Sequence, residues 1–513
     1  MAMDHADCPK NKSALPARIA TAVTILCCMA LILLSGLSSA PERNWDDWGR
    51  HEKQYEELTR AILSGHLYLP EEPAAFLAGM ENPYDPAART IAGDEAGAYA
   101  LIDTAYYQGR YYVYFGLTPA LLLYLPFRLL TGRILPTWIA VIATSVLLVP
   151  VLFLFFRCLC GKYARQTPTG IRLLLSVSLI GTLGIPYLAA FCTTYSMPAV
   201  MGLLLTLLGL SCFLTAERPD GSFHRLRLVI GSILLGLTVG CRPVMAVSYL
   251  LLFVIYADAI RRGAFFRREK ASSTNTVSVL LPALITGSLF LIYNALRFGD
   301  PLEFGFHYLF STRDLLHGRH SFGETLEGIR LLALNPPRIH RVFPFMEIFD
   351  YMGQYRESLY VEPMFGGLLP LHPLVIAGLL LNLPPSLRRP EKADDGKSNG
   401  TAVSALSLFL GLVILFVDAG IAGISQRYES DFALFFFLPA ALAFLRPFAE
   451  DDEDKKTTRR IRRIVTILLL LLTLTELFLS FAAILCDGRY FAMRDWNPEA
   501  YNRIASFFHF LIR

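Results

Sequence analysis

Apolar runs of about 20 residues recur along the whole chain, and each is long enough to cross the hydrocarbon core of a bilayer as a helix. Short charged blocks separate these runs. Of the 513 residues, 54% are hydrophobic and only 18% are charged, whereas a soluble domain carries roughly a quarter charged residues. The sequence therefore predicts an all-α polytopic membrane protein and argues against one large soluble domain.

Eleven membrane spans are expected. They cover residues 19–39, 135–157, 173–191, 195–215, 228–241, 243–259, 276–296, 366–385, 402–422, 431–448 and 464–486. The interval 228–259 is interpreted as two short helices because both of its flanks are basic. Its turn is expected at Gly240-Cys241-Arg242-Pro243.

Five basic clusters mark one side of the predicted bundle. They contain Arg157, Lys162, Arg165 and Arg172; Arg218, Arg225 and Arg227; Arg261, Arg262, Arg267, Arg268 and Lys270; Arg388, Arg389, Lys392 and Lys397; and Lys455, Lys456, Arg459, Arg460, Arg462 and Arg463. With eleven spans, all five clusters fall on the side of the N-terminus, which the positive-inside rule makes cytoplasmic. The first apolar run is longer than the 7–15 residues or so of a cleavable signal, so we expect a retained anchor.

This topology divides the chain into five parts. They are a cytoplasmic N-terminus (1–18), a transmembrane module (19–296) with a first outer loop at 40–136, a second outer loop (297–365), C-terminal transmembrane helices (366–486) and an outer tail (487–513). The first outer loop should begin with a helix within Trp45–Leu69, whose apolar positions are Tyr55, Leu58, Ile62 and Leu63, and end with an interfacial helix over Pro119–Leu130.

Metal and nucleotide motifs are weak in this sequence. Most of the nine cysteines lie in apolar runs, as small buried hydrophobes do, and the histidines lack the spacing of a metal site. No glycine-rich phosphate loop or nucleotide motif is found, and nucleic acid is not an expected partner. No cofactor is predicted with certainty, and a divalent metal stays open.

Three acids are candidate catalytic residues. Asp46 and Asp47 follow the first span between Trp45 and Trp48, where a carboxylate can take a proton from an acceptor hydroxyl. The alternative is that they cap the helix that follows. Asp103 stands in an otherwise apolar stretch, where it either completes a site or caps a turn.

Three arginines and one tyrosine are candidates for binding a phosphate. Arg242 lies in the turn between two apolar runs, and Arg297 and Arg427-Tyr428 lie at the outer ends of spans. The planar guanidinium group matches phosphate well, and charges inside a membrane are costly unless they serve a function. The alternatives are ion pairs between helices, with Asp418 or Glu476 as partners, and snorkelling to the membrane surface.

Taken in order, these features resemble the GT-C superfamily of membrane glycosyltransferases, close to the bacterial relatives of protein O-mannosyltransferase and aminoarabinose transferase. The resemblance is carried by the segments Tyr55–Leu69, Gly109–Pro119, Tyr293–Phe306 and Gln426–Asp431. It implies a sugar donor on polyprenyl phosphate and a lipid, glycan or protein acceptor. Transfer would take place on the extracytoplasmic face of a bacterial inner membrane. It also implies that Asp46 or Asp47 is the first-loop acid and that Asp103 is its partner.

Two other classes of function remain open. A transporter or flippase of lipid-linked sugars would also need many spans and buried charges, but it usually shows internal repeats, and none is found here. An inactive scaffold with the same fold would bind the donor without turnover.

Overall fold

The computed structural model describes residues 14–39, 53–114, 116–318, 320–350, 362–382, 400–449, 456–486 and 493–512. Within these ranges the chain is mainly helical, and its only sheets are two short antiparallel hairpins. Helix α1 runs through Ala14–Ser39, where the first span is predicted.

Seven helices of the described chain are long and apolar enough to cross a membrane. They are α1, α5 (Thr137–Tyr163), α8 (Ser196–Ala216), α12 (Lys270–Phe298), α16 (Gly400–Val417) with η7 (Asp418–Ala422), α17 (Glu429–Leu445) with η8 (Gln426–Tyr428) and η9 (Arg446–Phe448), and α18 (Lys456–Leu485). Each coincides with a predicted span. The chain is therefore a multi-pass membrane protein, as its composition predicts.

Shorter helices occupy the other four predicted spans. They are α6 (Thr169–Thr182) with α7 (Ile185–Ala190), α9 (Arg225–Leu237) with η4 (Thr238–Gly240), η5 (Pro243–Leu250) with α10 (Leu251–Ile255), and α14 (Leu368–Leu371) with α15 (Pro373–Asn382). Helix α11 (Ala257–Arg261) follows α10. These pieces are too short or too broken to be counted as spans by length, so the total of eleven stays a prediction.

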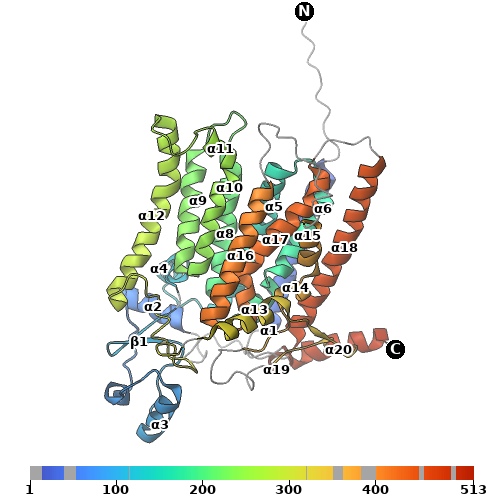
Figure 1. The fold of residues 1–513 in the computed structure, drawn as a ribbon. Coiled ribbons are helices and arrows are strands. Elements are labelled where there is room, and N and C mark those ends of the chain that lie inside the picture. Colours follow the sequence, from blue (N-terminus) through green and yellow to red (C-terminus); the bar gives the residue numbers. More distant parts are fainter. Residues whose placement is uncertain are drawn as a thin grey trace, which may run out of the picture.

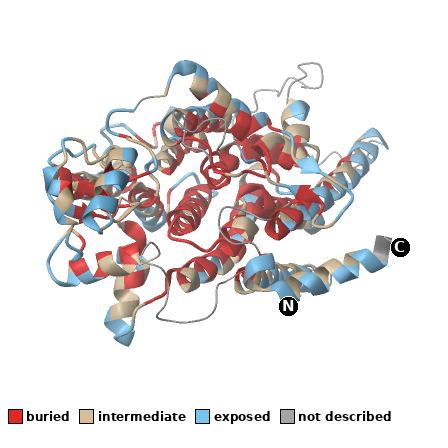
Figure 2. Cartoon of the chain, turned by 90° about the horizontal axis from the view of Figure 1, so that it is seen from below, coloured by how far each residue is buried: buried red, intermediate tan, exposed pale blue. Residues whose placement is uncertain are grey.

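Helix α17 forms the centre of the bundle. All of its residues are buried, and it packs against α5, α6, α8, α15 and α16. Seen from below in Figure 2, buried residues fill the middle of the molecule and exposed ones lie around its edge. Helix α12 lies at that edge, and its apolar side chains Leu289, Ile292 and Leu296 are exposed. Such a surface suits contact with lipid tails.

The two predicted outer loops form a layer at one end of the bundle. The first contains α2 (Gln54–Leu63), η2 (Ala75–Gly79), α3 (Pro86–Ala96), β1 (Ala105–Tyr107), β2 (Arg110–Tyr112), η3 (Ala120–Tyr124) and α4 (Leu125–Thr131); the second contains α13 (Phe322–Leu334), β3 (Arg338–Ile339) and β4 (Met346–Glu347). In Figure 1, α2, α3, β1 and α13 lie at the end of the bundle opposite α11. Two backbone hydrogen bonds tie these loops together, from Tyr106 N–H to the Tyr308 carbonyl (2.9 Å) and from Phe310 N–H to the Thr104 carbonyl (2.9 Å).

Two local predictions for this layer can be compared with the structure. The helix expected within Trp45–Leu69 is described only from Gln54 to Leu63, and Leu63, expected on its apolar face, is 49% exposed because the helix ends there. The predicted interfacial helix over Pro119–Leu130 is present as η3 and α4. The C-terminal tail adds α19 (Met493–Trp496) and α20 (Pro498–Ile512), which lie across the same end of the bundle in Figure 1.

Candidate functional site

The candidate site lies around the turn between α9 and η5. The sequence predicts a turn at this position. Arg242 lies between η4 and η5 and forms an ion pair with Asp431 in the first turn of α17. Asp431 is 1% exposed, so its carboxylate depends on this pairing and on the helix N-terminus for stabilisation. The pairing fixes the α9–η5 turn to the central helix.

The end of the first outer loop packs directly on this turn. Thr118 Oγ1 donates a hydrogen bond to the Leu237 carbonyl over 2.8 Å. A Cβ atom at Gly116 would lie 2.0 Å from the carbonyl oxygen of Gly240, so the two backbones meet where no side chain fits. This close approach requires glycine at position 116.

A cavity of about 290 Å³ lies beside the turn. Its polar lining comes from five parts of the chain. They are the η4–η5 turn (Arg242), α12 (Asn294 and Arg297), η7 (Asp418), η8 (Tyr428) and the loop after β2 (Tyr114). The rest of the lining is largely apolar and includes Phe290, Phe304, Phe306, Val417 and Ile421. The cavity therefore combines two guanidinium groups with an apolar wall contributed by α12 and η7.

Arg297 is held at the cavity by neutral groups. One guanidinium nitrogen donates to the Val113 carbonyl over 2.8 Å, and another donates to Asn294 Oδ1 over 2.7 Å. Its charged group stacks on Tyr293, 4.0 Å from the ring centre. Its Nε atom is buried and has no hydrogen-bond partner within the described ranges. A buried cation without a carboxylate partner favours an anionic ligand.

Arg427 is held by a carboxylate from the second outer loop. One of its terminal nitrogens lies 2.7 and 2.8 Å from the two carboxylate oxygens of Glu362, and Ser425 Oγ donates to the same carboxylate. Its guanidinium group lies over the rings of Tyr195 (4.7 Å) and Tyr428 (5.0 Å). Arg427 thus links the second outer loop to the wall of the cavity.

Asp103 is fixed by hydrogen bonds from three parts of the chain. Its carboxylate accepts a hydrogen bond from the Tyr195 hydroxyl. Its backbone N–H donates to the Phe310 carbonyl (2.8 Å), and its backbone carbonyl accepts from Gln54 Nε2 (2.9 Å). Its φ of +59° is uncommon for a residue other than glycine, although aspartate tolerates it better than most. The Asp103 carboxylate thus contacts the tyrosine over whose ring Arg427 lies.

Tyr114 shows how close these groups are to one another. Burial raises the pKa of Tyr114 above its ordinary value, and Tyr428 and Asp103 raise it further, whereas Arg242 and Arg427 lower it. All four groups are thus near enough to act electrostatically on one hydroxyl in the cavity wall.

Five of the seven residues selected from sequence are brought together here. Arg242, Arg297 and Tyr428 line the cavity, and Arg427 lies over the ring of Tyr428. Asp103 does not line the cavity, but it bonds Tyr195, over whose ring Arg427 also lies. Asp46 and Asp47 lie outside the described residues. The catalytic and phosphate-binding roles of all seven stay predictions.

Sequence reasoning missed two members of the cluster. Tyr195 stands in the polar stretch Thr193–Ser196 between two apolar runs, which is a weak signal for a site. Nothing in the sequence marks Glu362 as the partner of Arg427. The suggestion that Glu476 pairs with an arginine is wrong, because Glu476 contacts His372 (2.9 Å) and accepts a hydrogen bond from Thr182.

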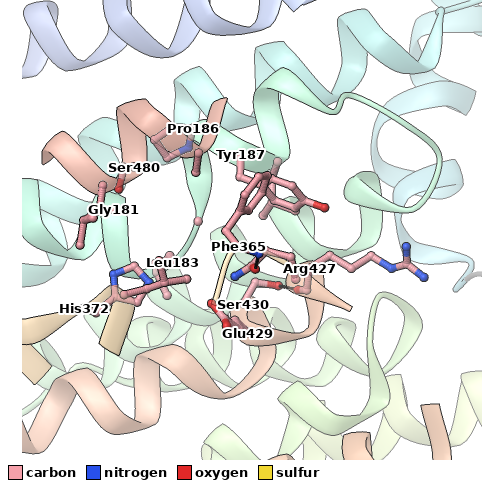
Figure 3. Close-up of a pocket in the computed structure, with 16 residues that line it drawn as sticks. Gly181, Leu183, Pro186, Tyr187, Phe365, His372, Arg427, Glu429, Ser430 and Ser480 are labelled. Atoms are coloured by element: carbon pink, nitrogen blue, oxygen red, sulfur yellow. Dashed lines mark hydrogen bonds between the residues drawn. The ribbon is translucent and has the colours of Figure 1, made fainter. Parts of the chain in front are cut away.

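A second, smaller cavity of about 40 Å³ lies on the other side of Arg427. Figure 3 shows His372 at one end of it, Glu429 and Ser430 below, and the Arg427 side chain extending away from His372. His372, which lines this cavity, bonds Glu476 of α18. This polar residue therefore takes part in a contact between helices. Within the described ranges, no group of three or more His, Cys, Asp or Glu side chains is arranged to hold a metal ion.

Comparisons with known proteins add one distant likeness. No family model matches the chain, and no curated protein matches it. Among solved structures it is similar to ArnT from Cupriavidus metallidurans bound to undecaprenyl phosphate, with 14% sequence identity and a TM-score of 0.42 over 90% of this chain and 76% of that one. Because so distant a likeness does not assign a function, the function is argued from the residues of this chain.

Proposed function

We propose that this protein is a membrane glycosyltransferase that moves a sugar from a polyprenyl-phosphate donor to an acceptor hydroxyl. The acceptor is a lipid, a glycan or a protein, and transfer takes place on the extracytoplasmic face of a bacterial inner membrane. The observation that carries the proposal is the cavity whose lining combines Arg242 and Arg297 with a large apolar part. Its volume is near the lower end of the roughly 300–1,000 Å³ range of small-molecule sites.

The chemistry follows from the charges around the cavity. A carboxylate takes the proton of the acceptor hydroxyl, whose oxygen attacks the anomeric carbon with inversion. The bond from that carbon to the donor phosphate breaks, and the lipid phosphate leaves with added negative charge. Fixed guanidinium groups stabilise this charge because they need not reorganise during the reaction. The lipid tail lies along the apolar wall.

The proposal gives the three acids two roles. Asp46 or Asp47 is the base, and Asp103 completes the acidic pair. Asp103 is the only one of the three within the described residues. A position near the cavity is supported by its electrostatic effect on Tyr114, which lines the cavity.

The proposal is tested by transfer of a labelled sugar from polyprenyl phosphate in proteoliposomes. The Asp46→Asn, Asp47→Asn double variant and Asp103→Asn should each lose turnover by 100-fold or more, in line with the roughly 10²–10⁴-fold contribution of acid–base groups. The control is Asp220→Asn, an exposed acid in the loop between α8 and α9. Wild-type turnover in both acid variants would contradict the assignment, and donor movement across the bilayer without transfer would favour a transporter.

The donor site has its own test, in which two buried arginines are compared. Arg297→Gln should raise the KM for the donor about 10- to 100-fold, because a hydrogen bond to a charged group is worth about 1.5–3 kcal/mol. The control is Arg89→Gln. Like Arg297, Arg89 is buried and lies over an aromatic ring, that of Phe310. It donates to two backbone carbonyls and does not line the cavity. An equal rise in KM in both variants would show that the effect is structural.

A further inference from the structure

A groove of about 590 Å³ lies between α1, α5 and α6, which all pack against one another. It lies where α1 and α6 begin and α5 ends. It shares no lining residue with the cavity beside Arg242, and in Figure 1 the α5 and α6 labels stand in the half of the bundle away from β1 and α3. The groove is thus separate from the candidate glycosyl-transfer site.

The mouth of the groove is cationic. Each helix contributes one arginine to it: Arg18 from α1, Arg157 from α5 and Arg172 from α6. Among the residues that the structure describes, no carboxylate lines the groove. Arg172 donates to Thr169 Oγ1 over 3.0 Å, and in the part of the chain that the structure describes no acid pairs with any of the three. Three like charges around one hollow repel each other, so an anion between them is stabilising.

The interior of the groove is largely apolar, with Thr21 and Ser176 as its polar residues. Ile25 and Pro150 each lie seven residues, or two helical turns, from the arginine on the same helix. Since an α-helix rises 1.5 Å per residue, these side chains lie about 10 Å deeper than the guanidinium groups. Phe153 and Leu173 line the stretch between. Polarity therefore changes from cationic to hydrocarbon along the groove, in the direction of the helix axes.

We propose that this groove binds one anionic phospholipid. Its headgroup phosphate lies among Arg18, Arg157 and Arg172, and one acyl chain runs inward past Phe153 and Ile25. A soluble anion would use the arginines but not the apolar interior. A neutral lipid would use the interior but leave the arginines uncompensated. An anionic lipid satisfies both, and basic pockets between transmembrane helices suit such headgroups.

The first experiment measures lipid retained by the full-length protein in native mass spectrometry. The probes are dioleoyl phosphatidylglycerol, which is anionic, and dioleoyl phosphatidylcholine, which is zwitterionic. The triple variant Arg18→Gln, Arg157→Gln, Arg172→Gln should bind the anionic lipid on the order of 100-fold more weakly, at roughly 1 kcal/mol per cation. The matched control removes three exposed arginines outside the groove, Arg225→Gln, Arg268→Gln, Arg460→Gln, and should keep wild-type affinity.

The second experiment uses the wild-type protein and so does not depend on the folding of a variant. A photoreactive phosphatidylglycerol should crosslink to peptides from residues 14–25, 150–163 and 169–176. Inorganic phosphate at millimolar concentration should not displace it. Crosslinks elsewhere, equal loss of lipid in both triple variants, displacement by phosphate alone or equal retention of the zwitterionic lipid would each overturn the proposal.

Discussion

The buried charges of the candidate site differ in how they are compensated. Arg427 and Arg242 each have a carboxylate partner, Glu362 and Asp431, whereas Arg297 is held by a carbonyl and an amide. Breaking a buried ion pair leaves an uncompensated charge and costs more than the pair itself contributes. The two paired arginines therefore stabilise the fold as well as the site, and Arg297 is the one most available to a ligand.

Loss of the Glu362 carboxylate should weaken both fold and activity. Replacing Glu362 by Ala leaves Arg427 buried without its partner, which typically costs about 3–5 kcal/mol. The apparent Tm of the purified protein in detergent should fall clearly. Glu57→Ala breaks the more exposed pair with Arg60 and should cost less than about 1 kcal/mol. Equal shifts of Tm in the two variants would show that losing the buried Arg427–Glu362 pair destabilises the protein no more than losing the exposed pair.

Tyr195 should act as a positioning residue for Asp103. Tyr195→Phe keeps the ring under Arg427 but removes the hydroxyl that donates to the carboxylate. We expect kcat to fall about 10-fold or more, with little change in the KM for the donor, because the arginines at the cavity are untouched. Unchanged kcat in the proteoliposome assay, or a rise in donor KM as large as that of Arg297→Gln, would contradict this role.

His320 should make stability depend on acid pH. Burial and the nearby Arg313, 3.0 Å away, lower the pKa of His320 to about 4 from its ordinary 6.5. Since the unfolded chain takes up this proton first, the free energy of unfolding should fall as the pH drops from about 6.5 to 4. Thermal unfolding across this range should show a smaller fall in stability for His320→Gln than for the wild type. Parallel curves for His320→Gln and the wild type would rule out this contribution.

At the scale of elements, the site depends on a loop meeting a turn. The end of the first outer loop packs on the α9–η5 turn, and the first turn of α17 pairs with it from the other side. Tyr428 and Asp431, three residues apart at the start of α17, contribute to the cavity wall and to the ion pair respectively. Small shifts between these elements should therefore change the cavity directly.

Gly116 tests this contact. Gly116→Ala places a methyl group 2.0 Å from the Gly240 carbonyl, so the loop must move away from the turn. We expect a lower Tm and a weaker affinity for the donor, since overpacking typically costs about 1–3 kcal/mol. The control is Gly161→Ala in α5, where the added Cβ meets nothing within 4 Å and helix propensity favours alanine. A normal Tm and affinity in Gly116→Ala would mean that the loop is free to adjust.

At the scale of the whole molecule, polar layers lie at the two ends of an apolar bundle. The outer-loop layer with α3 and β1 lies at one end in Figure 1, and α11 lies at the other. By the positive-inside rule we expect the arginine-rich end to lie in the cytoplasm. The proposed lipid groove and the candidate transfer site would then face opposite leaflets.

Cysteine accessibility tests this orientation. In a variant without native cysteines, Glu95→Cys in α3 should react with a membrane-impermeant maleimide on intact spheroplasts. Ser222→Cys, in the loop between α8 and α9, should react only after permeabilisation. Both positions are exposed, so burial does not account for a difference. Labelling of both residues from the same side would overturn the topology.

Sequence alone determined the class of protein and the position of most helices. Apolar runs of about 20 residues are a local property, since a helix satisfies its own backbone hydrogen bonds in a membrane. The turn at Arg242 was likewise predictable from its glycine, proline and basic flanks. The number of spans was harder to predict. Short helices such as α6 and α15 are apolar like the long spans, so composition does not distinguish the two.

Only the tertiary structure decided which polar residues meet. Asp103 and Tyr195 are 92 positions apart, and Glu362 and Arg427 are 65 apart, so no local pattern links either pair. Sequence marked Arg242, Arg297 and Arg427 as costly charges in apolar surroundings, but their partners depend on how the outer loops pack over the bundle. A charge that becomes buried stands out in the sequence because its neighbours are apolar. The group that compensates it depends on how distant segments pack together.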